Sequence, residues 1–523
     1  MKNKFNVCKT TPNPSLGRRG VFFSFEKLKI VFSSPPSKEG LGVVVLCFFL
    51  LKISFISAQT GCILDSATYM RVPLSAPLMR GSYQNLPKEV SLKKYCPEPR
   101  GQGDYGTCVG WTVAYMARTI TLAQKNNWTN QVQITENALS PYFLYENIKA
   151  YDDQNCQGGA TLFAGLEIMK RMGTVPFKDF GIACNQPQSD KNKEKALQNR
   201  IKDYKRLFNY GTKDKTEFIK KSLSEEKPVL VGIRGLFNSF VTAKDSIWKP
   251  AEKDKNSDER GHALTVIGYN DTIGAFEVMN SWGTKWANKG FIWVKYEDFN
   301  AICMEAYELI IQENNDMLAG EISFMLSAGL PLEIRLKSAS NSPHLTCGGN
   351  YEVQKPLRSG TLFRLYLSNP QPAYVYIFSV DENKKTFVIF PYSNEISPFL
   401  AYKGNKIALP SENHYIEFDN TSGTLGNMLS GTSNNTLKGI EYYCVLYSRQ
   451  KLNLPSILES LKAFEGDLGV SLKKVLGAEL IPEKFVEYLD NQKDNQQNNQ
   501  LISFKTSTQF GSILPIIVAI KHQ

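Results

Sequence analysis

The sequence predicts an α+β fold for the first part of the chain, followed by a β-rich, sandwich-like domain. Two observations predict the first part: stretches with helical periodicity come first, and strand-like segments separated by turn residues follow them. This order favours a helical layer packed on an antiparallel sheet. A third observation predicts the second part, because short strand-like runs bounded by Asn, Gly, Pro and Ser recur beyond residue 318.

The length and composition of the chain are those of a multidomain globular protein. It has 523 residues, enough for two or three domains, and a hydrophobic content of 42%. The formal net charge of +11 suggests a nucleic-acid partner, but residues 1–58 carry nine Lys or Arg against two Glu, a net charge of +7. The remaining +4 is spread with mixed signs over the rest of the chain, so we expect no nucleic-acid partner.

A secretory signal peptide is predicted near 41–58. The stretch 42–59, GVVVLCFFLLKISFISAQ, follows positive charge, is apolar and ends in small residues. The segment before it is unusually long and rich in Pro and Gly, so we interpret 1–58 as an atypical leader and signal peptide. We expect a secreted, periplasmic or cell-surface protein that meets the membrane only through this transient peptide. Because Lys52 interrupts the apolar run, an uncleaved anchor is the less favoured alternative.

The elements follow in order after the leader. Residues 59–95 are expected to form an extended arm that is too short to be a folded prodomain. The domain at 96–315 should contain helices at 108–126, 139–151, 160–173 and 191–205, and strands at 227–235, 262–270, 275–282 and 289–296. The β-rich domain at 318–523 should contain strands at 363–369, 373–381, 385–392, 405–410, 441–449 and 512–522, a helix at 455–466 and a polar loop at 492–500.

The cysteines give no sign of a metal site. Of ten in the chain, eight lie beyond the leader, with no CxxC pair and no metal-ligand spacing. Disulfides are compatible with export, but the spacing leaves their pairing open.

One short segment carries the chemistry that the sequence suggests. In GQGDYGTCVGW, residues 101–111, Cys108 stands where a helix is expected to begin, and a helix N-terminus lowers the pKa of a thiol. A cysteine nucleophile also needs a base, usually imidazole. Of the four histidines, only His262 precedes the β-rich domain, and Asn280 and Trp282 follow it in the sequence NSWG. An indole beside an Asn–His hydrogen bond would exclude water from it.

Taken together, these motifs resemble the papain-like cysteine peptidase family. The resemblance rests on GQGDYGTCVGW, NCQGGAT at 155–161, GHALTVIGY at 261–269 and NSWG at 280–283, which occur in the family's order over roughly 90–310. It implies a two-lobed fold, with a helical lobe and an antiparallel β lobe. The C-terminal half resembles a β-rich domain of unknown function found beside exported bacterial peptidases.

The resemblance also implies a role for each site residue and needs neither a metal nor an organic cofactor. Cys108 would be the nucleophile, His262 the general base and acid, Asn280 the residue that orients the imidazole, and Gln102 an oxyanion donor. Gly158 and Gly159 would bind an extended peptide in strand fashion. The other substrate-binding candidates are Ala160, Thr161, Ala263 and Trp282. The small residues among them suggest room for a bulky apolar side chain.

Two departures from the family pattern bear on these expectations. Tyr105 stands where the family has the cysteine that pairs with the position of Cys156, so Cys156 can pair with Cys184 or Cys96, or stay free. No helical prodomain precedes Cys108, although the arm could lie across the cleft.

We therefore expect a secreted cysteine peptidase that cleaves peptide or protein substrates through an acyl-enzyme. The alternatives are an inactive papain-like fold that binds a peptide or cell-surface partner, and an acyl or amide transferase that uses the same thiol. The sequence predicts no particular oligomeric state.

Overall fold

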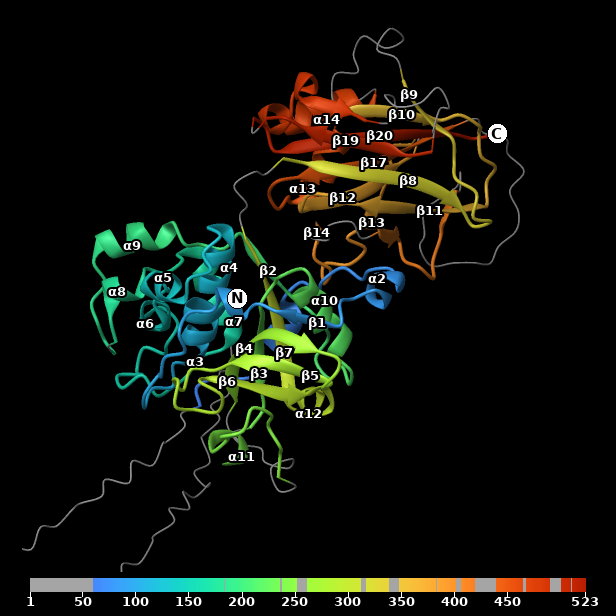
Figure 1. The fold of residues 1–523 in the computed structure, drawn as a ribbon. Coiled ribbons are helices and arrows are strands. Elements are labelled where there is room, and N and C mark those ends of the chain that lie inside the picture. Colours follow the sequence, from blue (N-terminus) through green and yellow to red (C-terminus); the bar gives the residue numbers. More distant parts are fainter. Residues whose placement is uncertain are drawn as a thin grey trace, which may run out of the picture. The chain divides into compact units, whose positions relative to one another are not determined.

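The computed structural model describes residues 60–523, apart from the segments 183, 236–237, 252–260, 312–316, 338–347, 382, 401–405, 419–438, 464–466, 490–499 and 509 (Figure 1). The leader and signal peptide predicted at 1–58, with the anchor alternative, lie outside the described residues, as does nearly all of the predicted loop at 492–500. Within the described part of the chain, no helix combines the length and apolar character needed to cross a bilayer.

The first sheet is the antiparallel sheet expected from the strand-like segments. Its strands run in the order β2-β7-β3-β4-β5-β6, and β1 pairs with β4. Their bounds are β1 Glu89–Ser91, β2 Asp203–Arg206, β3 Val229–Ile233, β4 His262–Asn270, β5 Ala275–Met279, β6 Phe291–Lys295 and β7 Cys303–Ile310. Nearly all side chains of β3, β4 and β5 are buried, since helices cover this sheet (Figure 1).

The helical layer contains the predicted helices, most of them shortened at their ends. The helix expected at 108–126 is confirmed as one continuous run of α3 Cys108–Gly110, the π-helical η2 Trp111–Arg118 and α4 Thr119–Lys125. The others are α1 Ser66–Arg71, α2 Gly81–Gln84, η1 Lys93–Tyr95, α5 Gln131–Glu136, α6 Pro141–Glu146, α7 Leu162–Arg171, α8 Phe177–Phe180, α9 Asp190–Leu197, α10 Thr216–Ser224, α11 Asn238–Val241 and α12 Tyr296–Ile302. Trp111, Tyr115 and Phe177 pack ring against ring in its core.

Two expectations for this region differ from the structure. The helix expected at 191–205 ends at Leu197, and 203–206 form β2 instead, because pairing with β7 supplies backbone hydrogen bonds that a solvated helix end lacks. The arm at 59–95 is not simply extended: it contains α1, α2, β1 and η1.

The β-rich part is a sandwich, as predicted. One sheet has the order β13-β12-β17-β20-β10-β9 with β14 on β12, and the other β15-β11-β8-β19-β18 with β16 on β11. Phe324 and Phe363 of the second sheet pack edge-to-face against Tyr443 of the first, so the two inner faces share a core. Helices α13 Leu454–Lys462 and α14 Leu468–Leu476 cover the outer face of the first (Figure 1).

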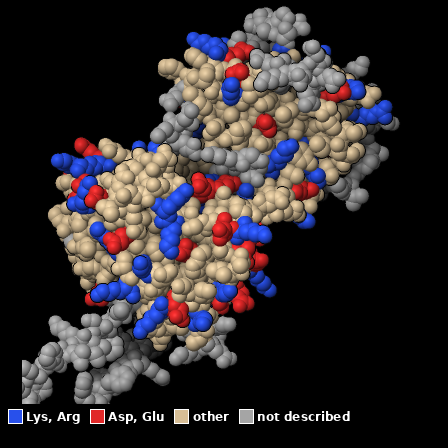
Figure 2. All heavy atoms as spheres, viewed as in Figure 1, with Lys and Arg blue, Asp and Glu red and all other residues tan. Residues whose placement is uncertain are grey.

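The bounds of the sandwich strands are β8 Ala319–Leu326, β9 Ile334–Leu336, β10 Gly349–Val353, β11 Thr361–Ser368, β12 Ala373–Val380, β13 Thr386–Phe390, β14 Phe399–Leu400, β15 Lys406–Leu409, β16 Ile416–Phe418, β17 Ile440–Ser448, β18 Val486–Tyr488, β19 Ile502–Thr506 and β20 Ile513–Lys521, with short 3-10 turns at η5 Gly477–Glu479 and η6 Glu483–Phe485. Basic and acidic side chains are intermixed on the face seen in Figure 2.

A buried ion cluster stabilises the edge of the first sheet. The carboxylate of Glu308 lies 3.3 Å from Lys205 Nζ and 3.1 Å from Lys227 Nζ, and it accepts a hydrogen bond from Ser222. Burial alone would raise the pKa of Glu308, but the two ammonium groups outweigh it and lower the pKa to about 2.

Replacing this carboxylate should therefore destabilise the fold. Glu308→Gln would remove the carboxylate that lies 3.3 Å from the fully buried ammonium of Lys205, and we expect the free energy of unfolding at pH 7 to fall by about 3–5 kcal/mol. Because the folded pKa lies below the ordinary value of 4.5, the contribution is complete above pH 4.5 and is lost as pH falls toward 2. Urea unfolding across this range measures both effects. A variant as stable as the unaltered chain would contradict the assignment.

Candidate active site

Cys108 is the first residue of α3, at the start of the long helical run. The helix can begin here because Gly110 leaves room for α6: a Cβ on Gly110 would lie 2.4 Å from the carbonyl oxygen of Pro141. The side chain is completely buried. Burial raises the pKa of the Cys108 thiol to about 11, although the N–H groups of Ala263, Gly61 and Val109 act in the opposite direction. In this arrangement the thiol is neutral.

His262 and Asn280 form the hydrogen bond expected of an oriented imidazole. His262 opens β4, Asn280 follows β5, and His262 Nε2 lies 2.8 Å from Asn280 Oδ1. The same Oδ1 accepts the N–H of Ser281, which can only donate, so this atom is the amide oxygen and Nε2 carries the ring proton. His262 Nδ1 is then the basic nitrogen, and it makes no hydrogen bond within the described residues.

The environment of the imidazole keeps it neutral. The ring of Trp282 stacks on it with a centroid distance of 4.9 Å and an interplanar angle of 25°. Burial lowers the pKa of His262 to about 4, and the bond to Asn280 offsets only part of that effect. Helix α3, which Cys108 opens, packs against strand β4, which His262 opens. The structure therefore pairs His262 with Asn280 and places the helix that begins at Cys108 against the same strand.

Gln102 is tied to the loop that carries Asn280. Its backbone N–H donates to the carbonyl of Ser281 at 2.8 Å, and its side-chain Oε1 accepts from Ser281 Oγ at 2.6 Å. Its Nε2 donates to the carbonyl of Tyr105 at 2.7 Å. These contacts direct the Nε2 end of the Gln102 amide toward the loop that precedes Cys108. Ser281 was missed as a positioning residue, although its place beside Asn280 in NSWG was a usable signal.

The glycine pair follows a segment that contacts the loop before Cys108, where Gly106 N–H donates to the carbonyl of Cys156 at 2.7 Å. Gly159 has a φ of +79°, and its N–H donates to Tyr145 Oη at 2.8 Å. Next to it, Ala160 presents both of its backbone polar groups to the arm. Thr161 instead accepts from the N–H of Ala164 as the N-cap of α7, which gives this candidate a structural role.

The first described residues of the arm run between Ala160, which follows the glycine pair, and Gly261, which precedes His262. Ala160 N–H donates to the carbonyl of Gly61 at 2.8 Å, and Ile63 N–H donates to the carbonyl of Ala160 at 2.9 Å. Cys62 N–H donates to the carbonyl of Gly261 at 3.2 Å. The segment thus adds a short strand, parallel at Ala160 and antiparallel at Gly261. No motif in the sequence signalled this contact.

The arm also contacts the loop that precedes Cys108. A Cβ on Gly61 would lie 1.9 Å from the carbonyl oxygen of Gly106, and the backbone of Gly61 is among the groups that lower the pKa of Cys108.

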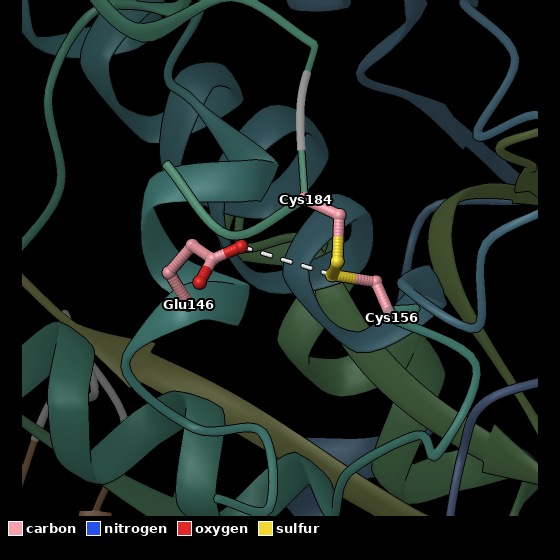
Figure 3. A group of neighbouring side chains, drawn as sticks. All are labelled: Glu146, Cys156 and Cys184. Carbon is pink, nitrogen blue, oxygen red and sulfur yellow. Dashed lines mark hydrogen bonds between the residues drawn. A yellow bond between two sulfur atoms is a disulfide. The ribbon is translucent and has the colours of Figure 1, made fainter. Parts of the chain in front are cut away.

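Of the pairings left open for Cys156, the structure contains the one with Cys184. Glu146 is the acidic neighbour of this disulfide, with Oε1 3.7 Å from the sulfur of Cys156 (Figure 3). The other carboxylate oxygen pairs with Lys149 Nζ at 2.9 Å, and that ammonium also lies 3.8 Å from Cys156 Sγ. Although these three acidic and sulfur side chains are close enough to share a metal ion, the disulfide leaves no thiolate to bind one.

The fold and these side chains define a class of protein. A helix that starts at a cysteine and packs on an antiparallel sheet that carries a paired His and Asn is the framework of a cysteine peptidase. Comparison with known proteins specifies the class: residues 86–311 match the model of the papain family of cysteine proteases. Residues 356–428 match a domain of unknown function, DUF4384.

Individual relatives are distant. The chain is 25% identical over 228 residues to an uncharacterised peptidase C1-like protein of Acanthamoeba polyphaga mimivirus, a match covering 41% of this chain and 70% of that protein. It is 22% identical over 255 residues to cathepsin K of Gallus gallus, covering 47% of this chain and 71% of cathepsin K. Among solved structures, xylellain, a cysteine protease from Xylella fastidiosa, is similar at 22% identity and a TM-score of 0.41, covering 49% of this chain and 96% of xylellain.

Proposed function

We propose that this protein hydrolyses peptide bonds with Cys108 as nucleophile, His262 as base and acid, and Asn280 as the residue that orients the imidazole. The observation that carries the proposal is the bond from His262 Nε2 to Asn280 Oδ1, because it places the proton on Nε2 and leaves Nδ1 as the proton acceptor. Export through the predicted signal peptide belongs to the same proposal.

The chemistry follows from this tautomer. Nδ1 of His262 takes the proton of the Cys108 thiol, and the sulfur attacks the carbonyl carbon of the peptide bond, forming a C–S bond. The developing oxyanion is stabilised by the backbone N–H of Cys108 and the amide of Gln102. The imidazolium then gives its proton to the leaving amine as the C–N bond breaks. Water, deprotonated by His262, hydrolyses the thioester and restores the thiol.

The substrate would take the place of the arm. Gly158, Gly159 and Ala160 form one side of the groove, and the backbone groups of Ala160 and Gly261 that bind the arm are those an extended peptide needs. Once the arm leaves, water reaches the site, and less burial moves the pKa of Cys108 down and that of His262 up. Both changes favour the thiolate–imidazolium pair.

Covalent labelling tests the proposal. An epoxide inhibitor of thiol peptidases should modify one residue per chain, Cys108, as measured by intact mass and peptide mapping, and the label should be lost in His262→Ala. Cys96 and Cys303 are buried thiols outside the arm segment that moves, burial raises the pKa of both, and they serve as internal controls. The experiment is done on the unaltered chain and on Gly61→Val, in which the arm is displaced. A folded protein unlabelled in both forms would support the binding-protein alternative instead.

A further inference from the structure

The loop that carries the glycine pair is held by two buried side chains. Tyr145 lies in α6 and is fully buried, and Asp153, in the loop itself, is 7% exposed. Tyr145 Oη accepts the N–H of Gly159 at 2.8 Å and donates its proton to Asp153 Oδ2 at 2.7 Å. The other carboxylate oxygen, Oδ1, accepts the N–H of Gln157 at 2.9 Å. A tyrosine and an aspartate therefore fix the loop at two backbone positions.

The chemistry of the groups sets the direction of these bonds. A backbone N–H can only donate, so Tyr145 Oη accepts from Gly159 and keeps its own proton for Asp153. Burial raises the pKa of the Tyr145 phenol, and the hydrogen bond to Asp153 raises it further, so the hydroxyl stays neutral. Both hydrogen bonds to Asp153 end on a carboxylate, and such bonds are roughly twice as strong as those between neutral groups.

The two glycines make room for different groups. A Cβ on Gly158 would lie 3.1 Å from Asp153 Cγ, and a Cβ on Gly159 would lie 2.5 Å from the carbonyl oxygen of Gly61 in the arm. Gly158 therefore leaves space for the buried carboxylate, and Gly159 leaves space for the backbone that lies beside it. The N–H of Gly159 bonds to Tyr145, whereas the groups that bind the arm belong to Ala160.

We infer that Tyr145 and Asp153 are positioning residues of the peptidase, which orient Ala160 for its two backbone hydrogen bonds to an extended substrate. The inference deepens the proposed function and rests on it. Only the φ and ψ of Gly159 separate the peptide group held by Tyr145 from the one whose N–H donates to the arm. Glycine is the residue with the most conformational freedom, so its conformation depends on such external bonds.

Steady-state kinetics in the Gly61→Val protein test this role. Tyr145→Phe keeps the ring and removes the bond to Gly159 N–H, and we expect KM to rise by about tenfold while kcat stays within about twofold. KM alone should change because the hydrogen bonds of Ala160 act equally on the bound substrate and the transition state. A fall in kcat at an unchanged KM would place the effect on the reacting groups and overturn the inference.

Tyr115→Phe is the matched control. Tyr115 is also fully buried, but its hydroxyl donates to the carbonyl of Glu98 at 2.7 Å instead of to the glycine loop. Each variant loses one buried hydroxyl, so the two melting temperatures should fall by similar amounts, and only Tyr145→Phe should change KM. If Tyr145→Phe lowers the melting temperature but has the KM of Tyr115→Phe, its role is structural and the inference fails.

Two variants of Asp153 separate position from charge. Asp153→Asn keeps an oxygen for Gln157 N–H and an amide that can donate to Tyr145 Oη, whose second lone pair still accepts from Gly159. We expect KM to stay within about twofold for Asp153→Asn and to rise by about tenfold for Asp153→Leu, which keeps neither bond. Equal rises in both would show that the charge and not the hydrogen bonds matters, which contradicts a positioning role.

The arm provides a readout that does not depend on turnover. In the unaltered chain Ile63 N–H donates to the carbonyl of Ala160 at 2.9 Å, so the arm is a resident ligand of Ala160. Hydrogen exchange of Ile63, measured by mass spectrometry, should be about tenfold faster in Tyr145→Phe and unchanged in Tyr115→Phe. If exchange accelerates in this way but no variant cleaves peptides, the proposed function fails and the positioning role stands. Equal exchange in the two variants overturns the positioning role whether or not cleavage occurs.

Discussion

A Gly61→Val variant should cleave peptides faster than the unaltered chain. A Cβ on Gly61 would lie 1.9 Å from the carbonyl oxygen of Gly106 and 2.3 Å from its carbon, which are backbone atoms that cannot move aside. Valine would therefore force the strand at 61–64 out of the groove. If the closed form outweighs the open one by about ten to one, kcat/KM rises by about tenfold when the arm is displaced.

The rest of the arm should stay in place in this variant. Tyr69 in α1 is fully buried and donates its hydroxyl proton to the carbonyl of Phe208 at 2.8 Å, and Arg206 Nε donates to the carbonyl of Val72 at 2.7 Å. Only the segment before Asp65 needs to move. The cost of the three backbone hydrogen bonds lost with it is about 2 kcal/mol, which leaves the fold intact.

The matched control for this experiment is Gly81→Val. Gly81 belongs to the same arm, but no heavy atom lies within 4 Å of its Cβ position, so the substitution should not affect access to Cys108. Initial rates on a fluorogenic peptide and melting temperatures are measured for both variants. Equal rates for Gly61→Val and the unaltered chain, with both folded, would show that the arm does not restrict the site.

The sequence predicted those parts of the fold and site that are marked by local patterns. The strand at 262–270 has the bounds expected from its run of apolar residues, and a buried helical run begins at Cys108 as expected, although 111–118 is π-helical. Cys108, His262 and Asn280 were singled out because each stands in a short motif and their order is specific. The bond between His262 and Asn280, and the packing of α3 against β4, depend on how the strands and the helix pack, which no single motif specifies.

What the sequence did not predict depends on contacts between distant residues. The arm binds through backbone groups of Gly61, Cys62 and Ile63, and backbone hydrogen bonds leave no residue pattern to recognise. Tyr145 is one of many tyrosines, and its bond to Gly159 follows from a contact between a helix and a loop that no motif marks. Strand β2 was assigned to a helix for the same reason, since its stability comes from β7, about a hundred residues later in the chain.

The largest effect should follow from removing the nucleophile or its base. In the Gly61→Val background, Cys108→Ala and His262→Ala are each expected to lower kcat/KM by a factor on the order of 10⁴ or more. In the proposed mechanism the two side chains share one proton, so neither functions without the other. The double variant should accordingly be no slower than the single variants, because residues that act as a unit are not additive.

Asn280→Ala should lower kcat/KM by less than the removal of either reacting side chain. It removes the oxygen that accepts the Nε2 proton of His262 and leaves both reacting groups in place, so its loss should be clearly smaller than that of His262→Ala. Single-turnover and steady-state rates on one peptide are compared across the four variants. Strictly additive losses for Cys108→Ala and His262→Ala would mean that the thiol and the imidazole act independently, and a Cys–His acyl-enzyme mechanism requires that they do not.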